Sequence, residues 1–280
     1  MGRGEPGPFF GGNDMISTKQ ILNIQRVAFT PTLWRNPSKA GDAAFRRKRP
    51  AAPSWPDKPV YAKLPRAPKN GSPVPELTSL YHRSDPGNYG SRRYPGNCPG
   101  NLIKDLLRYF RPRNVFDPMT GSGTCRDVCH ELRIPHFSTD LKSGFDACDL
   151  AGYPAEKFDF VWIHPPYWRQ KVYSSDPRDL STTPTLEAFL HRYELLIRNC
   201  AQALTPRGRL AVLMGDYSDR DAGFVPLVYH TKRLCYGAGL VQRCTDIIRF
   251  SHGASSGRRT YTSSFIPGLH DVCVVMERRQ

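Results

Sequence analysis

The eight cysteines of this chain follow no pattern of a disulfide framework or a metal site. No two are spaced Cys-x-x-Cys, and none pairs with a histidine at the spacing of zinc ligands. The chain also lacks an apolar run of membrane length and an N-terminal signal pattern. These absences predict free thiols, no metal, no membrane span and a reducing, cytoplasmic compartment.

Acidic residues are also scarce. The 280 residues hold 25 Asp and Glu against 40 Lys and Arg, which gives a formal net charge of +15. Residues 1–93 alone carry 16 Lys and Arg against 6 Asp and Glu. Such a concentrated surplus predicts a polyanionic partner, although a solvated basic tail has the same composition.

Residues 1–75 lack sustained hydrophobic periodicity outside a short candidate helix at 18–27. They are rich in Pro, Gly, Lys and Arg, a composition typical of a segment that is extended or orders only against a partner. The sequence therefore predicts a basic N-terminal extension, residues 1–75, and a folded domain, residues 76–280.

In the folded domain, apolar runs alternate with helical patterns and breakers, as in a parallel sheet with crossover helices. This order indicates an α/β fold. Strands are predicted at 114–116, 135–139, 158–163, 209–215, 245–250 and 271–276, and helices at 102–110, 124–131, 185–204 and 228–236.

A glycine-rich motif joins the first of these strands to its helix. Residues 116–125 read Phe-Asp-Pro-Met-Thr-Gly-Ser-Gly-Thr-Cys. A strand, a glycine turn and a helix form a cradle for a nucleotide-like cofactor. Gly121 and Gly123 allow close backbone approach, and Thr124 is predicted to cap the helix. Taken alone, a Gly-x-Gly pattern is weak evidence, since many glycine turns bind nothing.

A second motif follows about forty residues later, where residues 158–168 read Phe-Asp-Phe-Val-Trp-Ile-His-Pro-Pro-Tyr-Trp. The predicted strand ends just before His164, and ligands of α/β proteins bind at the carboxyl ends of strands. Two successive prolines fix φ and stiffen the turn. Tyr167 offers an aromatic face at the same place.

Together the two motifs resemble those of the S-adenosylmethionine-dependent amino-methyltransferases of nucleic acids. Their first motif, Asp-Pro-Phe-x-Gly-Ser-Gly-Thr, matches Asp117–Thr124 except at Met119. Their catalytic motif, (Asp/Asn/Ser)-Pro-Pro-(Tyr/Phe/Trp), matches except at His164. Upstream, Tyr94–Asn101 looks like the family segment that covers the methionine end of the cofactor. The resemblance spans roughly residues 80–280 and implies a Rossmann-like methyltransferase fold, with a mostly parallel seven-stranded sheet and an antiparallel final strand.

The resemblance implies S-adenosyl-L-methionine as cofactor. Asp117 is expected to meet the methionine amino group, Asp140 the ribose hydroxyls, and Asp146 the adenine amino group, with Asp149 as a competitor for that last role. The predicted cofactor-binding set is Asn97, Asp117, Met119, Thr120, Gly121, Gly123, Thr124, Asp140 and Asp146.

Methyl transfer to an exocyclic amine needs hydrogen-bond acceptors for the NH₂ group, because its lone pair is delocalised into the ring. The predicted catalytic set is His164, Pro165, Pro166 and Tyr167. A neutral imidazole accepts one hydrogen bond, whereas a protonated one repels the sulfonium. A structural role for His164, or an inactive or altered enzyme, are the alternatives.

The substrate implied by the resemblance is DNA, with adenine N6 as the target and low sequence specificity, as in small phage-associated enzymes. Cytosine N4, an RNA amine, and a non-enzymatic DNA-binding protein are the alternatives. The chain has no Pro-Cys dipeptide after the second motif, which argues against covalent cytosine-C5 chemistry. The expected compartment is the cytoplasm of a bacterial or phage-infected cell, and the oligomeric state is left open. The predicted nucleic-acid contacts are Trp168, Arg258 and Arg259.

Overall fold

The structure is a computed structural model that describes residues 71–83, 85, 87–98, 100–250, 266 and 268–280. These residues belong to one of two compact units of the chain, residues 58–280. The helix predicted at 18–27, most of the predicted extension 1–75, and the pair Arg258 and Arg259 lie outside the described residues. Among the described residues, no helix has the length and apolar character needed to cross a membrane.

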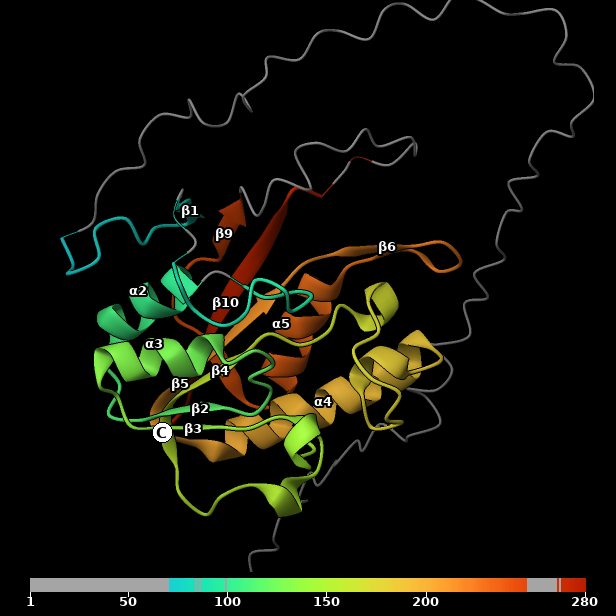
Figure 1. The fold of residues 1–280 in the computed structure, drawn as a ribbon, viewed down its shortest axis with the longest axis horizontal. Helices are drawn as coiled ribbons and strands as arrows, with labels where there is room; N and C mark the ends of the chain where they lie inside the picture. The colour runs from blue at the N-terminus through green and yellow to red at the C-terminus, as the bar shows by residue number, and fades with distance from the viewer. Residues whose placement is uncertain (1–70, 84, 86, 99, 251–265, 267) are drawn as a thin grey trace, which may run out of the picture. The chain divides into compact units, whose positions relative to one another are not determined.

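One large sheet organises the described residues (Figure 1), and its strands lie in the order β1-β9-β10-β5-β4-β2-β3, with β8 paired to β10. β2 runs parallel to β3 and β4, β4 to β5, and β1 to β9, whereas β10 is antiparallel to β5, β8 and β9. The strands are β1 (Leu80–Tyr81), β2 (Val115–Asp117), β3 (His136–Ser138), β4 (Phe158–Ile163), β5 (Leu204–Met214), β8 (Leu240–Gln242), β9 (Ile247–Phe250) and β10 (His270–Arg278).

This topology confirms the predicted Rossmann-like α/β fold with parallel strands and an antiparallel final strand. The resemblance implied seven strands, whereas eight strands belong to the sheet in the described residues. The two strands that sequence analysis missed, β1 and β8, span only two and three residues. Runs that short carry no readable alternation of apolar and polar residues.

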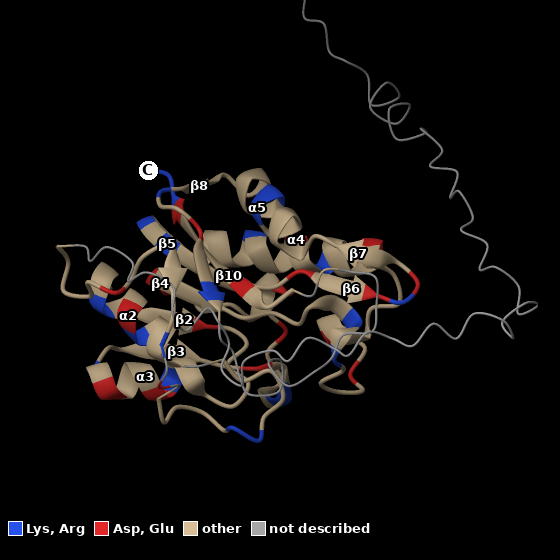
Figure 2. Ribbon diagram, turned by 90° about the horizontal axis from the view of Figure 1, so that it is seen from above, with Lys and Arg blue, Asp and Glu red and all other residues tan. Residues whose placement is uncertain are grey.

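Four helices cover the sheet, α2 and α3 on one face and α4 and α5 on the other (Figures 1 and 2). The strand residues alternate between two cores accordingly. From Phe160 to Ile163 in β4, Phe160 and Trp162 pack with α2 and α3, whereas Val161 and Ile163 pack with α4 and α5. Phe158 lies before a register shift and also packs with α4 and α5. The helices are α2 (Gly100–Phe110), α3 (Thr124–Leu132), α4 (Leu186–Ala203) and α5 (Leu227–Gly237).

The predicted boundary between helix 185–204 and strand 209–215 differs from the observed one. α4 begins after Thr185, whose hydroxyl accepts a hydrogen bond from the Ala188 N–H at 3.1 Å. β5 then starts directly at Leu204. Its pairing with β4 shifts register between Phe158 and Phe160. Pro206–Gly208 therefore interrupts the register within the strand and does not separate it from the helix.

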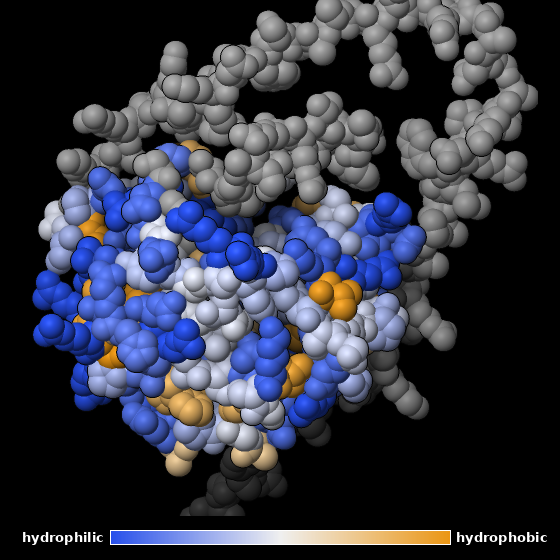
Figure 3. Space-filling view, viewed as in Figure 1, coloured by the Kyte–Doolittle hydropathy of each residue, from blue (hydrophilic) through white to orange (hydrophobic). Residues whose placement is uncertain are grey.

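The carboxyl ends of β2, β3 and β4 meet at one edge of the sheet, because these strands are parallel neighbours. Asp117 ends β2, Asp140 lies just beyond β3, and His164 follows β4. The fold thus brings together three side chains that the sequence separates by up to 47 positions. The described surface on the side shown in Figure 3 is largely hydrophilic, with small separate apolar patches.

Candidate active site

The glycine loop, residues 118–123, connects β2 to α3. Gly121 and Gly123 have φ values of 54° and 90°, in the left-handed region that favours glycine. The predicted cap is wrong, since Gly123 itself is the N-cap and no side chain caps the helix. Thr124 instead donates its hydroxyl proton to the side-chain oxygen of Asn97, to which Ser122 Oγ also donates at 2.9 Å. Asn97 thereby holds the predicted cover segment against the loop.

Tyr94 brings an aromatic ring of the cover segment over the glycine loop. A Cβ atom added at Gly121 would lie 3.0 Å from its Cε1 atom. The Lys142 Nζ atom lies 4.7 Å from the centroid of the Tyr94 ring. The Tyr94 and Tyr173 rings stack with centroids 6.0 Å apart. Two tyrosines distant in sequence thus face each other beside the loop.

Asp117 is a nearly inaccessible carboxylate, 2% exposed, at the end of β2. It accepts a hydrogen bond from the Met119 N–H at 3.2 Å. Burial removes water from the charged form and raises the pKa of Asp117 to about 7, although the backbone bond opposes the shift. A cation placed against this carboxylate would stabilise its charged form.

Asp140 supports the glycine loop from the next strand. One carboxylate oxygen accepts from the Gly121 N–H at 2.9 Å and the other from the Lys142 N–H at 3.1 Å. It also faces the cavity described below. Asp140 therefore fixes the loop and still presents oxygen atoms to a ligand.

Asp146 lines the cavity but already has strong partners. Its carboxylate oxygens lie 3.2 and 3.3 Å from Arg192 Nη2, and one accepts from the Cys148 N–H at 2.9 Å. Arg192 also donates to the Arg178 carbonyl at 2.8 Å. Asp146 therefore ties two loops of the cavity wall together, and its predicted contact with adenine stays a prediction.

His164 leaves the end of β4 in a half-buried position. Its Nε2 atom lies 3.2 Å from the Tyr167 hydroxyl. Burial lowers the pKa of His164 to about 4, because the imidazolium loses hydration that the protein does not replace. The histidine is therefore neutral at pH 7, as an acceptor role requires.

The Pro-Pro-Tyr part of the motif divides between the cavity wall and the interior. Pro166 lines the cavity, whereas Pro165 is buried. Tyr167 is absent from the cavity lining. Its ring packs so closely on Gly215 that a Cβ atom there would lie 2.8 Å from Cε2. Tyr167 is half-buried and lies outside the cavity lining, so its predicted stacking on a base stays a prediction.

Trp168 is buried in the core at 2% exposure. Its indole N–H donates to the Thr183 carbonyl at 3.1 Å. The predicted contact of Trp168 with nucleic acid is wrong for this conformation, because no face of the ring is accessible. Apolar packing and one satisfied polar atom account for its position.

The loop after the motif supplies cavity residues that sequence analysis missed. Asp179, 7% exposed, organises it by accepting from Ser174 Oγ at 2.8 Å and from the Ser181 N–H and Oγ at 2.8 and 2.7 Å. The Ser181 hydroxyl in turn accepts from the Tyr173 N–H at 3.1 Å. Short polar residues of this kind signal turns in a sequence, but nothing there indicates that the turn faces a cavity. Lining residues outside the predicted cofactor-binding and catalytic sets include Tyr94 of the cover segment, Lys142, Phe145 and, from this loop, Tyr173, Ser174 and Asp179.

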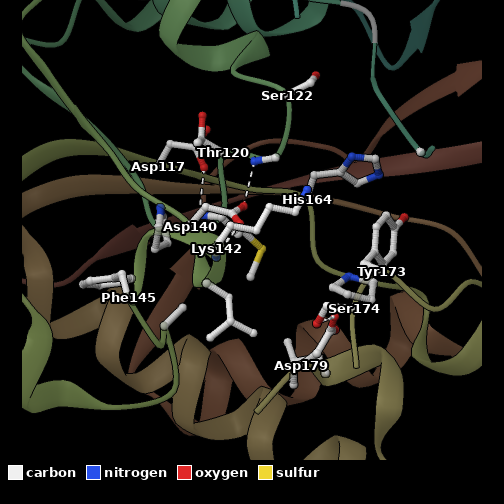
Figure 4. Close-up of a pocket in the computed structure, with 18 of the residues that line it drawn as sticks. Asp117, Thr120, Ser122, Asp140, Lys142, Phe145, His164, Tyr173, Ser174 and Asp179 are labelled. Carbon is white, nitrogen blue, oxygen red and sulfur yellow. Dashed lines mark hydrogen bonds between the residues drawn. The ribbon is translucent and has the colours of Figure 1, made fainter. Parts of the chain in front are cut away.

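A single cavity of about 210 Å³ joins these parts. Figure 4 shows residues of the glycine loop on one side, Tyr173 and Asp179 on another, and Asp140 between them. His164 borders the same cavity, so the two sequence motifs meet at one site. Among the predicted residues in its lining are Asn97, Asp117, Met119, Thr120, Gly121, Thr124, Asp140, Asp146, His164 and Pro166. Within the described ranges, no three His, Cys, Asp or Glu side chains are grouped as a metal site requires.

Comparison with protein-family models and with curated proteins finds no match. Solved structures with a similar fold include one from Thermus thermophilus described as a DNA modification methylase, complexed with S-adenosyl-L-methionine. It is 23% identical over 48% of this chain and 54% of its own, with a TM-score of 0.36. TrmN from Thermus thermophilus is 21% identical over 67% of this chain and 53% of its own, with a TM-score of 0.41.

A third structure is a SAM-dependent methyltransferase from Archaeoglobus fulgidus, 16% identical over 64% of this chain and 94% of its own, with a TM-score of 0.41. The chain spans about half the length of the first two structures that it matches. At these identities the similarity concerns the fold alone.

Proposed function

We propose that this chain transfers a methyl group from S-adenosyl-L-methionine to the exocyclic amino group of a nucleic-acid base, with adenine N6 of DNA as the first candidate. The observation that carries the proposal is the shared cavity. It runs from Asp117 and the glycine loop to His164 and Pro166, so cofactor and acceptor would meet in one cavity.

The residues present fit the cofactor. The buried carboxylate of Asp117 accepts a hydrogen bond from the Met119 N–H, and the carboxylate of Asp140 raises its pKa further. The methionine ammonium would supply a cation there. The left-handed glycine turn at Gly121 and Gly123 leaves the backbone open to a carboxylate. Asp140 would receive the ribose hydroxyls. Bound there, the cofactor supplies an electrophilic methyl group on a sulfonium.

The chain's contribution to the reaction would be position and hydrogen bonding. The two ring nitrogens of His164 would have different roles. Nε2 lies 3.2 Å from the Tyr167 hydroxyl, which leaves Nδ1 for the target amine. For Nδ1 to accept from the target amine, Nε2 must carry the proton and donate to the hydroxyl oxygen of Tyr167. Tyr167 would thus select the tautomer of His164, in place of stacking on the base.

The choice of nucleic acid as acceptor rests on the +15 charge and on the two motifs. Adenine N6 is favoured over cytosine N4 by resemblance alone, and RNA remains the alternative acceptor. The elements after the catalytic motif are largely used by the sheet and its helices, which leaves little surface for reading a base sequence. Low sequence specificity is therefore part of the proposal.

The test has two stages. Calorimetric titration with S-adenosyl-L-methionine measures binding, and no binding would leave a nucleic-acid-binding protein on a methyltransferase fold. Incubation with labelled cofactor and either DNA or RNA follows, with nucleoside digestion and mass spectrometry of the product. N6-methyladenine from DNA is the expected product. N4-methylcytosine or a methylated ribonucleoside would replace that substrate assignment, and unmodified nucleosides would overturn the proposed reaction.

A further inference from the structure

An arginine directly after the catalytic motif is bound to a separate part of the chain. Arg169 belongs to the short helix η4 (Trp168–Gln170), and its Nε and Nη2 donate to the two carboxylate oxygens of Asp219 at 2.9 and 2.6 Å. Asp219 lies in a two-stranded antiparallel ribbon formed by β6 (Tyr217–Asp219) and β7 (Gly223–Val225). Two parallel hydrogen bonds to one carboxylate fix the orientation of the Arg169 guanidinium, in addition to the attraction between the opposite charges.

Asp219 is itself held rigidly by the ribbon. It accepts from the Tyr217 hydroxyl and from the N–H groups of Asp221 and Ala222, each at 2.9 Å. Its side chain is 5% exposed, and Arg169 holds the pKa of its carboxyl far below the usual range. Arg169 also reaches Asp221 at 3.0 Å, but that carboxylate is 84% exposed. Asp219 is thus the fixed partner and Asp221 a solvated one.

Arg169 reaches back from this carboxylate to the catalytic turn, residues 164–168. Its guanidinium lies 4.4 Å from the centroid of the Trp168 ring. Trp168 has φ of 48°, a left-handed conformation that costs free energy for a bulky side chain and persists only where surroundings enforce it. Edge contact with the Tyr217 ring, at 6.4 Å between centroids, links Trp168 to the same ribbon.

The orientation of Trp168 is transmitted to His164 because the intervening backbone is stiff. Pro165 and Pro166 have fixed φ angles, and Tyr167 contacts His164 through its hydroxyl. We propose that Arg169 and Asp219 form a clamp that positions the catalytic turn. Arg169 is then a positioning residue for His164 and not a contact to phosphate. The inference rests on the proposed function for its catalytic readout.

Three variants test the clamp. Asp219→Asn removes the charge while keeping the shape, Arg169→Lys keeps the charge but loses the paired geometry, and Asp221→Asn is the matched control on the solvated partner. At saturating cofactor and nucleic acid, kcat is expected to fall about tenfold or more in Asp219→Asn and by an intermediate factor in Arg169→Lys. It should stay within about twofold in Asp221→Asn. The dissociation constant for the cofactor should change by less than about twofold in all three, because none lines the cavity.

Hydrogen exchange supplies a readout that needs no activity. The amides of residues 167–170 should exchange faster in Asp219→Asn than in the wild type and be unchanged in Asp221→Asn. Unchanged exchange in both Asp219→Asn and Arg169→Lys would overturn the clamp. A second result would also overturn the clamp: Arg169→Lys keeps its kcat, but its KM for nucleic acid rises and its nucleic-acid binding depends less steeply on salt. That pattern would indicate that Arg169 contacts phosphate. A wild type that methylates neither DNA nor RNA would defeat the proposed function, and the exchange data would still decide the clamp. If Asp219→Asn does not fold, Arg169→Lys carries the comparison.

Discussion

Burial acts on two titratable side chains of the cavity in opposite ways. It raises the pKa of Asp117 to about 7 and lowers that of His164 to about 4. In each case loss of water disfavours the charged form. The same physical cause therefore leaves a carboxyl poised to ionise when a cation arrives and a histidine that stays neutral.

The first prediction concerns the pH dependence of cofactor binding. If the ionised form of Asp117 binds the methionine ammonium, affinity should rise about tenfold between pH 6 and pH 8, with proton release on binding near pH 7. Calorimetry in buffers of different ionisation enthalpy measures both quantities. Asp117→Asn should bind weakly at every pH, whereas Asp149→Asn, an exposed residue outside the cavity lining, should behave as wild type.

The Asp117 carboxyl should also affect the stability of the protein without cofactor. The pKa of Asp117 is higher in the folded protein than the usual value near 3.9 of an unfolded chain. Its contribution to stability is thus fully present below about pH 4 and is lost as pH rises through about 7. Asp117→Asn should lack this loss in thermal unfolding. If the wild-type affinity for the cofactor does not change with pH and Asp117→Asn binds the cofactor tightly, Asp117 does not meet the cofactor.

The second prediction concerns His164. An unperturbed imidazole would titrate near 6.5, but the buried one has a pKa of about 4. At saturating cofactor, kcat should therefore stay level between pH 8 and about 5 and fall only as pH approaches 4. His164→Ala should lose about 100-fold or more in kcat with little change in cofactor affinity. An inflection of kcat near pH 6.5, or a full-rate His164→Ala, would contradict the acceptor role.

At the scale of elements, the glycine loop and the catalytic turn both contain left-handed backbone conformations, which residues other than glycine rarely adopt. The loop uses Gly121 and Gly123, for which left-handed φ values cost little. The turn uses Trp168, for which the same conformation is strained. The loop is therefore intrinsically able to form, whereas the turn depends on packing by η4 and the β6–β7 ribbon.

The third prediction separates backbone strain from ligand contact in the glycine loop. Gly121→Ala should weaken cofactor binding more than about tenfold, because its Cβ atom enters a cavity wall where Tyr94 already lies at 3.0 Å. Gly239→Ala is the matched control, since Gly239 also has a positive φ, of 80°, but no neighbour within 4 Å. The left-handed backbone should cost both variants about 1 kcal/mol of stability, and Gly121→Ala should lose somewhat more because the Tyr94 ring must give way.

Titration calorimetry and thermal unfolding distinguish the two effects. The expected pattern is destabilisation of both variants, with loss of cofactor binding in Gly121→Ala alone. If both variants bind the cofactor as wild type does, the cofactor does not approach the backbone at Gly121.

At the scale of the whole chain, positive charge is unevenly distributed along the sequence. Residues 1–70 hold 13 Lys and Arg against 4 Asp and Glu, so they supply +9 of the net +15. In the described elements, Figure 2 shows both signs of charge interspersed. The strongest electrostatic attraction for a polyanion is therefore expected from the first 70 residues.

The fourth prediction tests that expectation by truncation. Removal of residues 1–70 keeps Val74, which is buried in the folded domain at 6% exposure. Nucleic-acid affinity should fall and its logarithmic dependence on salt concentration should become shallower, by roughly 0.9 for each phosphate that the truncated protein no longer neutralises. Cofactor affinity serves as the control and should be unchanged. An unaltered salt slope would remove the basic extension from the binding surface.

The sequence by itself determined the parts whose signal is local. Glycines predicted the turn between β2 and α3, and the strand Phe158–Ile163 was predicted with its observed bounds because its apolar run ends at two prolines. The order of elements was enough for the α/β class, whereas the antiparallel final strand was implied by the family resemblance. Sequence analysis missed the short strands β1 and β8 and the β6–β7 ribbon. Each of these strands spans only two or three residues, and pairing with another strand is what defines it.

The tertiary structure alone decided what each motif residue faces. Sequence reasoning assigned Trp168 to nucleic acid, but the structure buries its ring and pairs its indole N–H with the Thr183 carbonyl. Tyr167, assigned to the base, is half-buried and packs on Gly215. Sequence reasoning placed Tyr94 in the cover segment but missed Tyr173, and the two rings come together only when the chain folds. Periodicity and spacing depend on the neighbours of a residue along the chain. Burial, ring contacts and pKa shifts depend on residues that are distant in sequence and close in the folded protein. The clamp between Arg169 and Asp219, fifty positions apart, belongs to that second kind.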